Sequence, residues 1–407
     1  MSTTTELSPR ASWILILSAS AILMITMGAR LTTGLFMSPI NTSTGLGIVS
    51  ISFALAIGQF VWGAAQPIFG VVADKYGSSK VIVAGALMLA TGLAITPFMS
   101  SQWGLMLSMG LLSAAGAGAG SFSILIGVTA QSLPPQRRAF AAGFINAGGS
   151  LGQFVFAPLM QAIISTAGWM MAMFTMAATT LLTIPLAWSF REKKAVAAPA
   201  SAVINEIGLG RQVRLAMRDR SYLCLHAGFF TCGFHIAFLV THLPGEVALC
   251  NLSAGVSATA LALIGLFNIV GSLSAGALGS RFRMKYLLVA MYASRAVIIA
   301  AYLLAPKSAW TFYIFAAALG LTWLATVPPT AGLVGKLFGV RYLATLFGLT
   351  LLSHQIGGFF GAWLGGLAMG NFGNYNWMWY ADMVLALAAA LINLPIREAP
   401  VSAPIQA

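Results

Sequence analysis

Twelve long apolar runs divide this chain, and they constrain its fold more than any other feature of the sequence. A helix needs about 20 mostly apolar residues to cross the hydrocarbon core of a bilayer. Only 7% of the residues are charged, against roughly 25% in soluble domains, so most of the surface must face lipid. The sequence therefore predicts an all-α membrane protein with twelve transmembrane helices. The expected spans lie at 13–38, 50–72, 81–99, 103–131, 139–164, 168–190, 221–244, 256–279, 286–304, 309–333, 342–370 and 375–396.

The distribution of basic residues predicts how the chain lies in the membrane. The formal net charge is +13, and nearly all lysines and arginines fall in loops on one side of the expected spans. Lys307 alone falls on the other side, and Arg30 and Arg295 fall within spans. Loops rich in Lys and Arg face the cytoplasm. We therefore expect a multi-pass protein of a bacterial inner membrane with both termini cytoplasmic, in contact with lipid and not with nucleic acid.

One long polar connection, from Arg191 to Arg220, separates two groups of six spans. The expected domains are a six-helix bundle at 1–190, a cytoplasmic linker at 191–220 and a second six-helix bundle at 221–407. Within the linker, apolar residues recur at helical spacing opposite Arg211, Arg214 and Arg218. This pattern is typical of a helix that lies on an anionic membrane surface, although a solvated linker explains it equally well.

The two groups of spans repeat each other at a constant offset of 205 residues, which indicates an internal duplication. The coinciding pairs are Gly28 with Gly233, Pro39 with Pro244, Gly127 with Gly332, Gly143 with Gly348, Gly152 with Gly357, and Phe154 with Phe359. Parallel repeats related by an axis along the membrane normal place a substrate between them, near the midplane. We therefore expect two pseudo-symmetric six-helix bundles that face each other across a central crevice.

The loop after the second span carries a recognisable motif, Gly70-Val-Val-Ala-Asp74-Lys75-Tyr-Gly77-Ser-Ser-Lys80. It resembles the signature loop of the major facilitator superfamily, and the second half carries a degraded copy that ends in Ser280-Arg281. The resemblance implies the fold of that superfamily and a cytoplasmic latch. The expected gating residues are Gly70, Asp74, Lys75, Gly77 and Arg281.

Within that superfamily, the chain is most similar to the bacterial relatives of monocarboxylate and oxalate/formate carriers. The similarity rests on Gly28 to Phe36 in span 1, Cys232 to Pro244 in span 7, and Ser353 to Gly358 in span 11. Two departures stand out: Asn268 and Ser272 occupy the positions where monocarboxylate carriers typically have Asp and Arg, and His354 lies about where oxalate carriers have a lysine. The resemblance implies transport of a small organic anion.

Three basic side chains within spans are the expected substrate contacts. A charge at membrane depth is costly and persists where it lines a wet cavity or finds a partner. Arg30 offers a planar fork that fits a carboxylate, and it coincides with His235 at the 205-residue offset. His354, on span 11, is expected to reach the same cavity. We expect Arg30 to bind the anion and the two histidines to take a proton or a second polar group, while core histidines with structural hydrogen bonds are the alternative.

Uncharged polar residues within the spans form a second group of candidates. The expected contacts are Gln153 and Asn146 in span 5, Asn268 in span 8, Ser123 in span 4 and Trp323 in span 10. Such side chains more often bind neighbouring helices together than contact a ligand. Arg295 is expected to be structural, with Asp382 as a possible partner.

Catalytic motifs, phosphate-binding loops, metal-ligand spacings and paired carboxylates within spans are missing from the sequence, so neither an enzyme nor a cofactor is expected. The leading interpretation is a monomeric secondary transporter of a small organic anion, a monocarboxylate, coupled to protons by symport. Two alternatives remain open. One is anion exchange of the oxalate/formate type, and the other is drug or metabolite efflux by proton antiport.

Overall fold

The computed structural model describes residues 8–133, 135–191, 208–279, 281–339 and 342–400. Every regular element in those ranges is helical. The first-half helices are α1 (Pro9–Leu31), η1 (Thr33–Phe36), α2 (Met37–Thr44), α3 (Ile48–Tyr76), α4 (Ser78–Ile95), η2 (Thr96–Phe98), α5 (Gln102–Leu105), η3 (Met106–Ser113), α6 (Ala114–Ala119), α7 (Phe122–Gln131), α8 (Pro135–Ala167), α9 (Trp169–Leu181), α10 (Thr183–Leu186) and η4 (Ala187–Phe190). A short helix α11 (Leu209–Ala216) precedes the second-half helices α12 (Arg220–Leu249), α13 (Ala254–Gly279), α14 (Met284–Leu304), α15 (Ala309–Gly320), α16 (Val327–Phe338), α17 (Leu343–Phe372) and α18 (Asn376–Asn393).

The predicted all-α membrane fold is confirmed. Among the described residues, nine helices are long and apolar enough to cross a membrane, and α15 is a shorter apolar helix. The remaining predicted spans correspond to α15 with α16, to α17 and to α18. The last two are less apolar because α17 contains Ser353, His354 and Gln355, and α18 contains Asp382.

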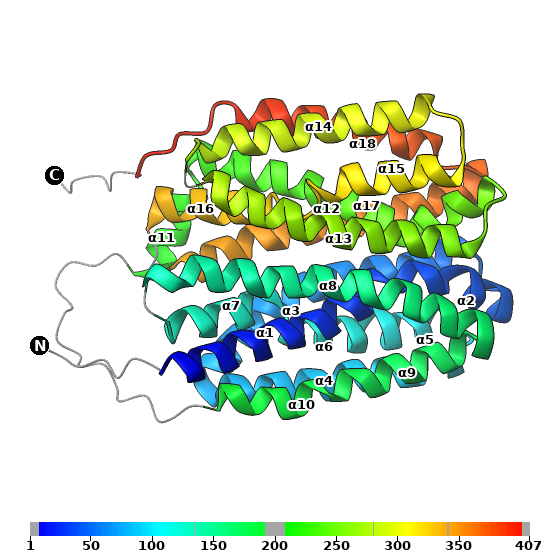
Figure 1. Ribbon diagram of the computed structural model, residues 1–407, viewed down its shortest axis with the longest axis horizontal. Coiled ribbons are helices and arrows are strands. Elements are labelled where there is room, and N and C mark those ends of the chain that lie inside the picture. The colour runs from blue at the N-terminus through cyan, green and yellow to red at the C-terminus, as the bar shows by residue number, and fades with distance from the viewer. Residues whose placement is uncertain (1–7, 134, 192–207, 280, 340–341, 401–407) are drawn as a thin grey trace, which may run out of the picture.

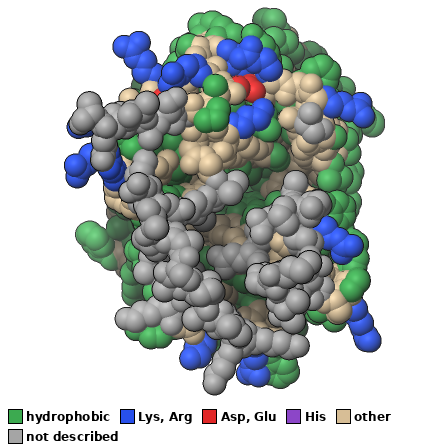
Figure 2. Space-filling view, turned by 90° about the vertical axis from the view of Figure 1, so that its left-hand side faces the viewer, with side chains coloured by type: hydrophobic (Ala, Val, Ile, Leu, Met, Phe, Trp, Pro, Cys, Tyr) green, Lys and Arg blue, Asp and Glu red, His purple; other side chains and the backbone are tan. Residues whose placement is uncertain are grey.

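The two groups of helices lie side by side with their axes roughly parallel (Figure 1). The start of α1, the end of α18 and α11 lie at one end of the molecule, which we call the terminal end, and α2 lies at the opposite, far end. Lysine and arginine side chains gather around the terminal end (Figure 2). Two expectations stay predictions: that this end faces the cytoplasm and that α11 contacts lipid. The domain boundaries at 190 and 220 also stay predictions, since residues 192–207 lie outside the described part.

Glycines let the central helices of each half cross at close range, and the two crossings match. In the first half, a Cβ on Gly152 of α8 would collide with the backbone of Met24 and Gly28 in α1. In the second half, a Cβ on Gly357 of α17 would collide with the backbone of α12 at Phe230. Gly152 and Gly357 coincide at the 205-residue offset, so the repeat seen in the sequence corresponds to a repeated packing geometry.

The halves meet along two helix pairs, α3 with α17 and α8 with α13. Toward the far end these contacts are tight: a Cβ on Gly34 of η1 would collide with the carbonyl oxygen of Val240 in α12, and one on Gly366 of α17 would collide with Ser52 in α3. Toward the terminal end, a Cβ on Gly70 or Gly348 would meet no atom within 4 Å. The halves are therefore packed together at the far end and less closely at the terminal end.

The tenth span is interrupted at its middle. α15 ends at Gly320 and α16 begins at Val327, and the intervening turns (321–326) do not continue either helix. Pro328 and Pro329 follow at the start of α16. Proline lacks an amide hydrogen, so it is tolerated in the first turn of a helix and breaks one further inside. We call residues 321–326 the span-10 break.

Gly34→Ala is predicted to disfavour the conformation described here, because its methyl group would meet the Val240 carbonyl. Overpacking of this kind costs about 1–3 kcal/mol, which is enough to shift a two-state equilibrium about 5- to 150-fold. Spin labels on cysteines at positions 42 and 251, in a cysteine-free background, would report the separation of the halves at the far end. We expect that distance to lengthen in Gly34→Ala and to stay constant in Gly127→Ala, where the added methyl meets open space; an unchanged distance in both would contradict the prediction.

Candidate functional site

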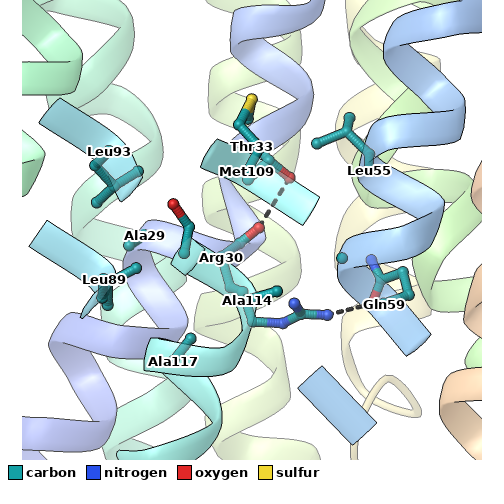
Figure 3. Close-up of a pocket in the computed structure, with 12 residues that line it drawn as sticks. Ala29, Arg30, Thr33, Leu55, Gln59, Leu89, Leu93, Met109, Ala114 and Ala117 are labelled. Carbon is teal, nitrogen blue, oxygen red and sulfur yellow. Dashed lines mark hydrogen bonds between the residues drawn. The ribbon is translucent and has the colours of Figure 1, made fainter. Parts of the chain in front are cut away.

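Arg30 lies near the end of α1, with its guanidinium group directed toward α3 (Figure 3). The group donates a hydrogen bond to the Gln59 side-chain carbonyl and lies 4.2 Å from the centroid of the Trp62 ring. A cation over a tryptophan face is stabilised by the ring quadrupole. Gln59 itself packs against Gly358 of α17, so the guanidinium lies next to the interface between the halves.

A small cavity of about 40 Å³ adjoins Arg30. Its walls come entirely from the first half, from α1, η1, α3, α4, η3 and α6, and they are mostly apolar (Figure 3). This volume accommodates water-sized molecules and not a carboxylate with its carbon skeleton. In this conformation the cavity beside Arg30 is therefore too small for an organic anion.

Arg30 has no acidic partner within the membrane part of its own half. The sequence contains eight acidic residues, and the only two before Glu192 are Glu6 and Asp74, one in the N-terminal tail and one at the end of α3. The partners that the structure gives to the guanidinium, an amide and an indole ring, are both neutral. The positive charge of Arg30 is thus left without a countercharge from the first half.

Three polar residues form a strip on the face of α8 that meets α13. Asn146, Ser150 and Gln153 are all at most 3% exposed, and they follow one another at helical spacing. Among the described residues, the amide groups of Asn146 and Gln153 have no hydrogen-bond partner. Buried polar groups are normally paired with protein or ordered water, so these two amides are available to a solvent molecule or a ligand.

Asn268 connects this strip to the span-10 break. Its side-chain nitrogen donates to the Ser150 hydroxyl oxygen at 2.7 Å, which joins α13 to α8 across the halves. Its side-chain oxygen accepts from the backbone N–H of Leu324 at 2.9 Å. Asn268 was expected to contact substrate, and the structure gives it this bridging position.

Ser123 and Trp323 do not line the cavity beside Arg30. Ser123 donates to the Gln66 side chain at 3.0 Å, a contact between α7 and α3 within the first half. Trp323 is fully buried in the span-10 break, and its ring centroid lies 5.7 Å from that of His235.

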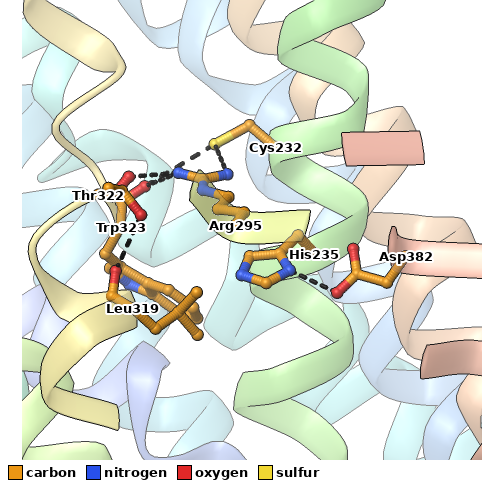
Figure 4. Close-up of polar contacts among 7 residues, drawn as sticks. All are labelled: Cys232, His235, Arg295, Leu319, Thr322, Trp323 and Asp382. Carbon is orange, nitrogen blue, oxygen red and sulfur yellow. Dashed lines mark hydrogen bonds and ion pairs between the residues drawn. The ribbon is translucent and has the colours of Figure 1, made fainter. Parts of the chain in front are cut away.

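His235 is paired with Asp382 inside the second half (Figure 4). Nδ1 of the imidazole lies 2.5 Å from Oδ2 of the carboxylate, and the two side chains are 1% and 0% exposed. Asp382 had been considered as a partner of Arg295, whereas this hydrogen bond joins it to His235. The sequence does contain a signal for this pair: a basic and an acidic residue, His235 and Asp382, each lie within a span of the same half.

Arg295 holds the span-10 break (Figure 4). Its guanidinium donates to the backbone carbonyls of Thr322 and of Trp323, the latter at 2.6 Å, and to the Cys232 sulfur at 3.3 Å. Carbonyl groups at the end of a helix carry partial negative charge, which favours a nearby cation. This contact could not be predicted from the sequence, because residue type does not show which backbone carbonyls a break in a span leaves free.

His354 lies on α17 with its ring against Phe229, at a centroid distance of 4.9 Å. The Gln355 amide lies 2.8 Å from its Nδ1. Neither His354 nor His235 belongs to the wall of the cavity beside Arg30. The structure therefore does not bring the three expected basic residues together in this conformation.

The expected gating residues are only partly visible. Gly77 has a positive φ of 94° between α3 and α4, a conformation that favours glycine. Gly70 lies six residues before the end of α3, and Arg281 is exposed after α13. The side chains of Asp74 and Lys75 lie outside the described residues, so the latch stays a prediction.

Comparison with known proteins agrees with this architecture. The Major Facilitator Superfamily profile matches residues 17–362. The chain belongs to the Major Facilitator Superfamily. Similar members include monocarboxylate transporter 13 of Rattus norvegicus, which is 27% identical over 94% of this chain and 89% of that protein. The oxalate:formate antiporter of Oxalobacter formigenes is 23% identical over 96% of this chain and 93% of that protein.

These matches confirm the family resemblance seen in the sequence. The chain is a multi-pass membrane transporter of the superfamily, related to monocarboxylate transporters and to an oxalate:formate antiporter. Gln59 and Trp62, the neutral partners of Arg30, and Cys232, a partner of Arg295, were not among the expected site residues. Residue type alone does not reveal such partners, since it does not specify which side of a helix faces which neighbour.

Asn268→Ala is predicted to destabilise this superfamily member more than Ser150→Ala does. Each change leaves one buried N–H unpaired, that of Leu324 in the first and that of the Asn268 side chain in the second, at a cost of about 1–3 kcal/mol. The first change also removes the Asn268–Ser150 hydrogen bond, which adds about 0.5–1.5 kcal/mol. Apparent melting temperatures in detergent, followed by size-exclusion chromatography of heated samples, would compare the two. Equal melting temperatures for both variants would show that the bond to Leu324 contributes nothing.

Proposed function

We propose that this protein is a secondary transporter of a small organic anion, a monocarboxylate, and that it works by alternating access. The observation that carries the proposal is Arg30, a partly buried cation beside the interface whose only described side-chain partners are neutral. A charge at membrane depth requires compensation. A carboxylate supplies it with two parallel hydrogen bonds to the guanidinium fork.

The polar strip on α8 fits the same ligand. The free amides of Asn146 and Gln153 offer N–H donors on α8, the other first-half helix that lines the interface with the second half. An anion between Arg30 and this strip would touch helices of the first half and would draw α13 and α17 toward it. The related proteins are named for monocarboxylates and for oxalate and formate, which are all small carboxylates.

Proton symport is the coupling that we infer, because a proton cancels the charge that the anion brings across. Anion exchange is the second candidate, and it is favoured by the similarity to an oxalate:formate antiporter. We propose that both termini lie in the cytoplasm, because the Lys- and Arg-rich loops lie at that end of the spans. The proposal also takes the protein to be a monomer in a bacterial inner membrane.

Uptake of labelled small carboxylates into proteoliposomes tests both the substrate class and the coupling. Accumulation driven by an imposed pH gradient supports symport, and uptake that needs preloaded anion supports exchange. Failure to take up any of a panel of mono- and dicarboxylates under either condition would contradict the proposed substrate class.

Arg30→Lys is predicted to raise the KM for the anion at least about tenfold, because lysine keeps the charge and loses the planar fork. Arg30→Gln, which also loses the charge, should abolish uptake. Arg191→Lys is a matched control, since Arg191 also lies over a tryptophan ring, at 5.3 Å, but on an exposed turn at the terminal end. Wild-type KM and rate in Arg30→Lys would refute the assignment of Arg30.

A further inference from the structure

The pair formed by His235 and Asp382 has the features of a proton-binding site. Both side chains are essentially inaccessible, and one polar atom of each, Nε2 of His235 and Oδ1 of Asp382, has no hydrogen-bond partner among the described residues. A purely structural pair in a helical core would be expected to satisfy these atoms. Nδ1 is engaged with Asp382, so Nε2 is the ring nitrogen that is left without a partner.

Several charged and titratable side chains surround the pair, and they determine the net charge that a proton on His235 would add to the second half. From α14, Arg295 and Tyr292 face the same core, and the positive charge of Arg295 interacts with Asp382. The carboxylate and the guanidinium balance each other. The other titratable neighbours are Cys232 and His242 on α12 and His354 on α17. A proton on Nε2 therefore creates one net positive charge in the second half.

A series of contacts leads from this pair to the interface between the halves. The ring of His235 packs against Trp323 in the span-10 break, at a centroid distance of 5.7 Å, and the carbonyl of Trp323 is held by Arg295. The next residue, Leu324, donates its N–H to Asn268. Asn268 in turn donates to Ser150 in the first half. A change at His235 thus reaches α8 through one ring contact with Trp323 and two hydrogen bonds, Leu324 to Asn268 and Asn268 to Ser150.

We propose that the His235–Asp382 pair binds the coupling proton, and that the span-10 break transmits its protonation state to the α8–α13 interface. The proton adds to Nε2 of His235, so that an imidazolium faces the Asp382 carboxylate. The new charge repels the Arg295 guanidinium and weakens its hold on the Thr322 and Trp323 carbonyls. The break, and with it the bridge through Asn268, then becomes free to rearrange. This inference rests on the proposed anion transport.

Two assays on the same proteoliposomes separate the proton site from the anion site. One measures carboxylate accumulation driven by a pH gradient, with a pH-sensitive dye in the lumen to report proton entry. The other measures exchange of labelled for unlabelled carboxylate at equal pH on both sides, which moves no net proton. We expect Asp382→Asn and His235→Gln to lose at least about tenfold in gradient-driven accumulation and in proton entry while they retain exchange. Retained exchange also shows that the variants fold.

His226→Gln is the matched control, because His226 lies on the same helix and is bonded to the Ser353 hydroxyl at 2.6 Å, away from Asp382. It should keep both activities. Wild-type proton coupling in both Asp382→Asn and His235→Gln would overturn the inference and leave the anion transport intact. A wild-type protein that exchanges anions without moving protons would overturn it as well. If neither assay detects a carboxylate, the proposed function itself fails.

Should both pair variants lose exchange, Asn268→Ser decides between misfolding and coupling. This variant shortens the bridge without touching the pair. We expect it to exchange the anion and to accumulate it less steeply with the pH gradient. A gradient response equal to wild type in Asn268→Ser would overturn the transmission through the break.

Discussion

Burying a guanidinium away from water is the costly step that organises this molecule, and each half compensates it differently. In the second half, Arg295 meets backbone carbonyls and the field of Asp382, so its charge is balanced within the protein. In the first half, Arg30 meets a glutamine and a tryptophan, and the sequence offers no carboxylate within the membrane part of that half. The uncompensated positive charge of Arg30 lies beside the interface, where a ligand has access. This charge is the physical reason to expect that the interface attracts an anion.

Close helix crossings make each half a mechanical unit. Gly152 against α1 and Gly357 against α12 allow backbone-to-backbone contact, and interiors packed at this density deform little. The contacts between halves are different in kind, since they combine glycine contacts at the far end with polar contacts such as that of Asn268 with Ser150. On the proposed mechanism, we therefore expect motion to be concentrated at the interface and at the span-10 break.

The fold followed from the sequence because lipid imposes simple requirements on length and polarity, and because a constant offset exposed the repeat. The site followed less well. Arg30 was recognisable as a charge at membrane depth, but periodicity does not say that it stacks on Trp62. The offset suggested that His235 would face the same cavity as Arg30. The structure turns His235 toward Asp382 instead, since the second half carries an acidic residue within a span and the first half has none.

The unequal charges of the halves bear on the membrane potential. On the proposed assignments, the empty carrier has one excess positive charge, at Arg30, and the carrier with both anion and proton also has one, at His235. Moving a charge across 100 mV changes the free energy by about 2.3 kcal/mol. The membrane potential therefore changes the free energy of the empty and the fully loaded carrier by the same amount when they cross. It neither drives nor opposes accumulation of the anion. It distinguishes only the half-loaded forms, which are neutral with the anion alone and doubly positive with the proton alone.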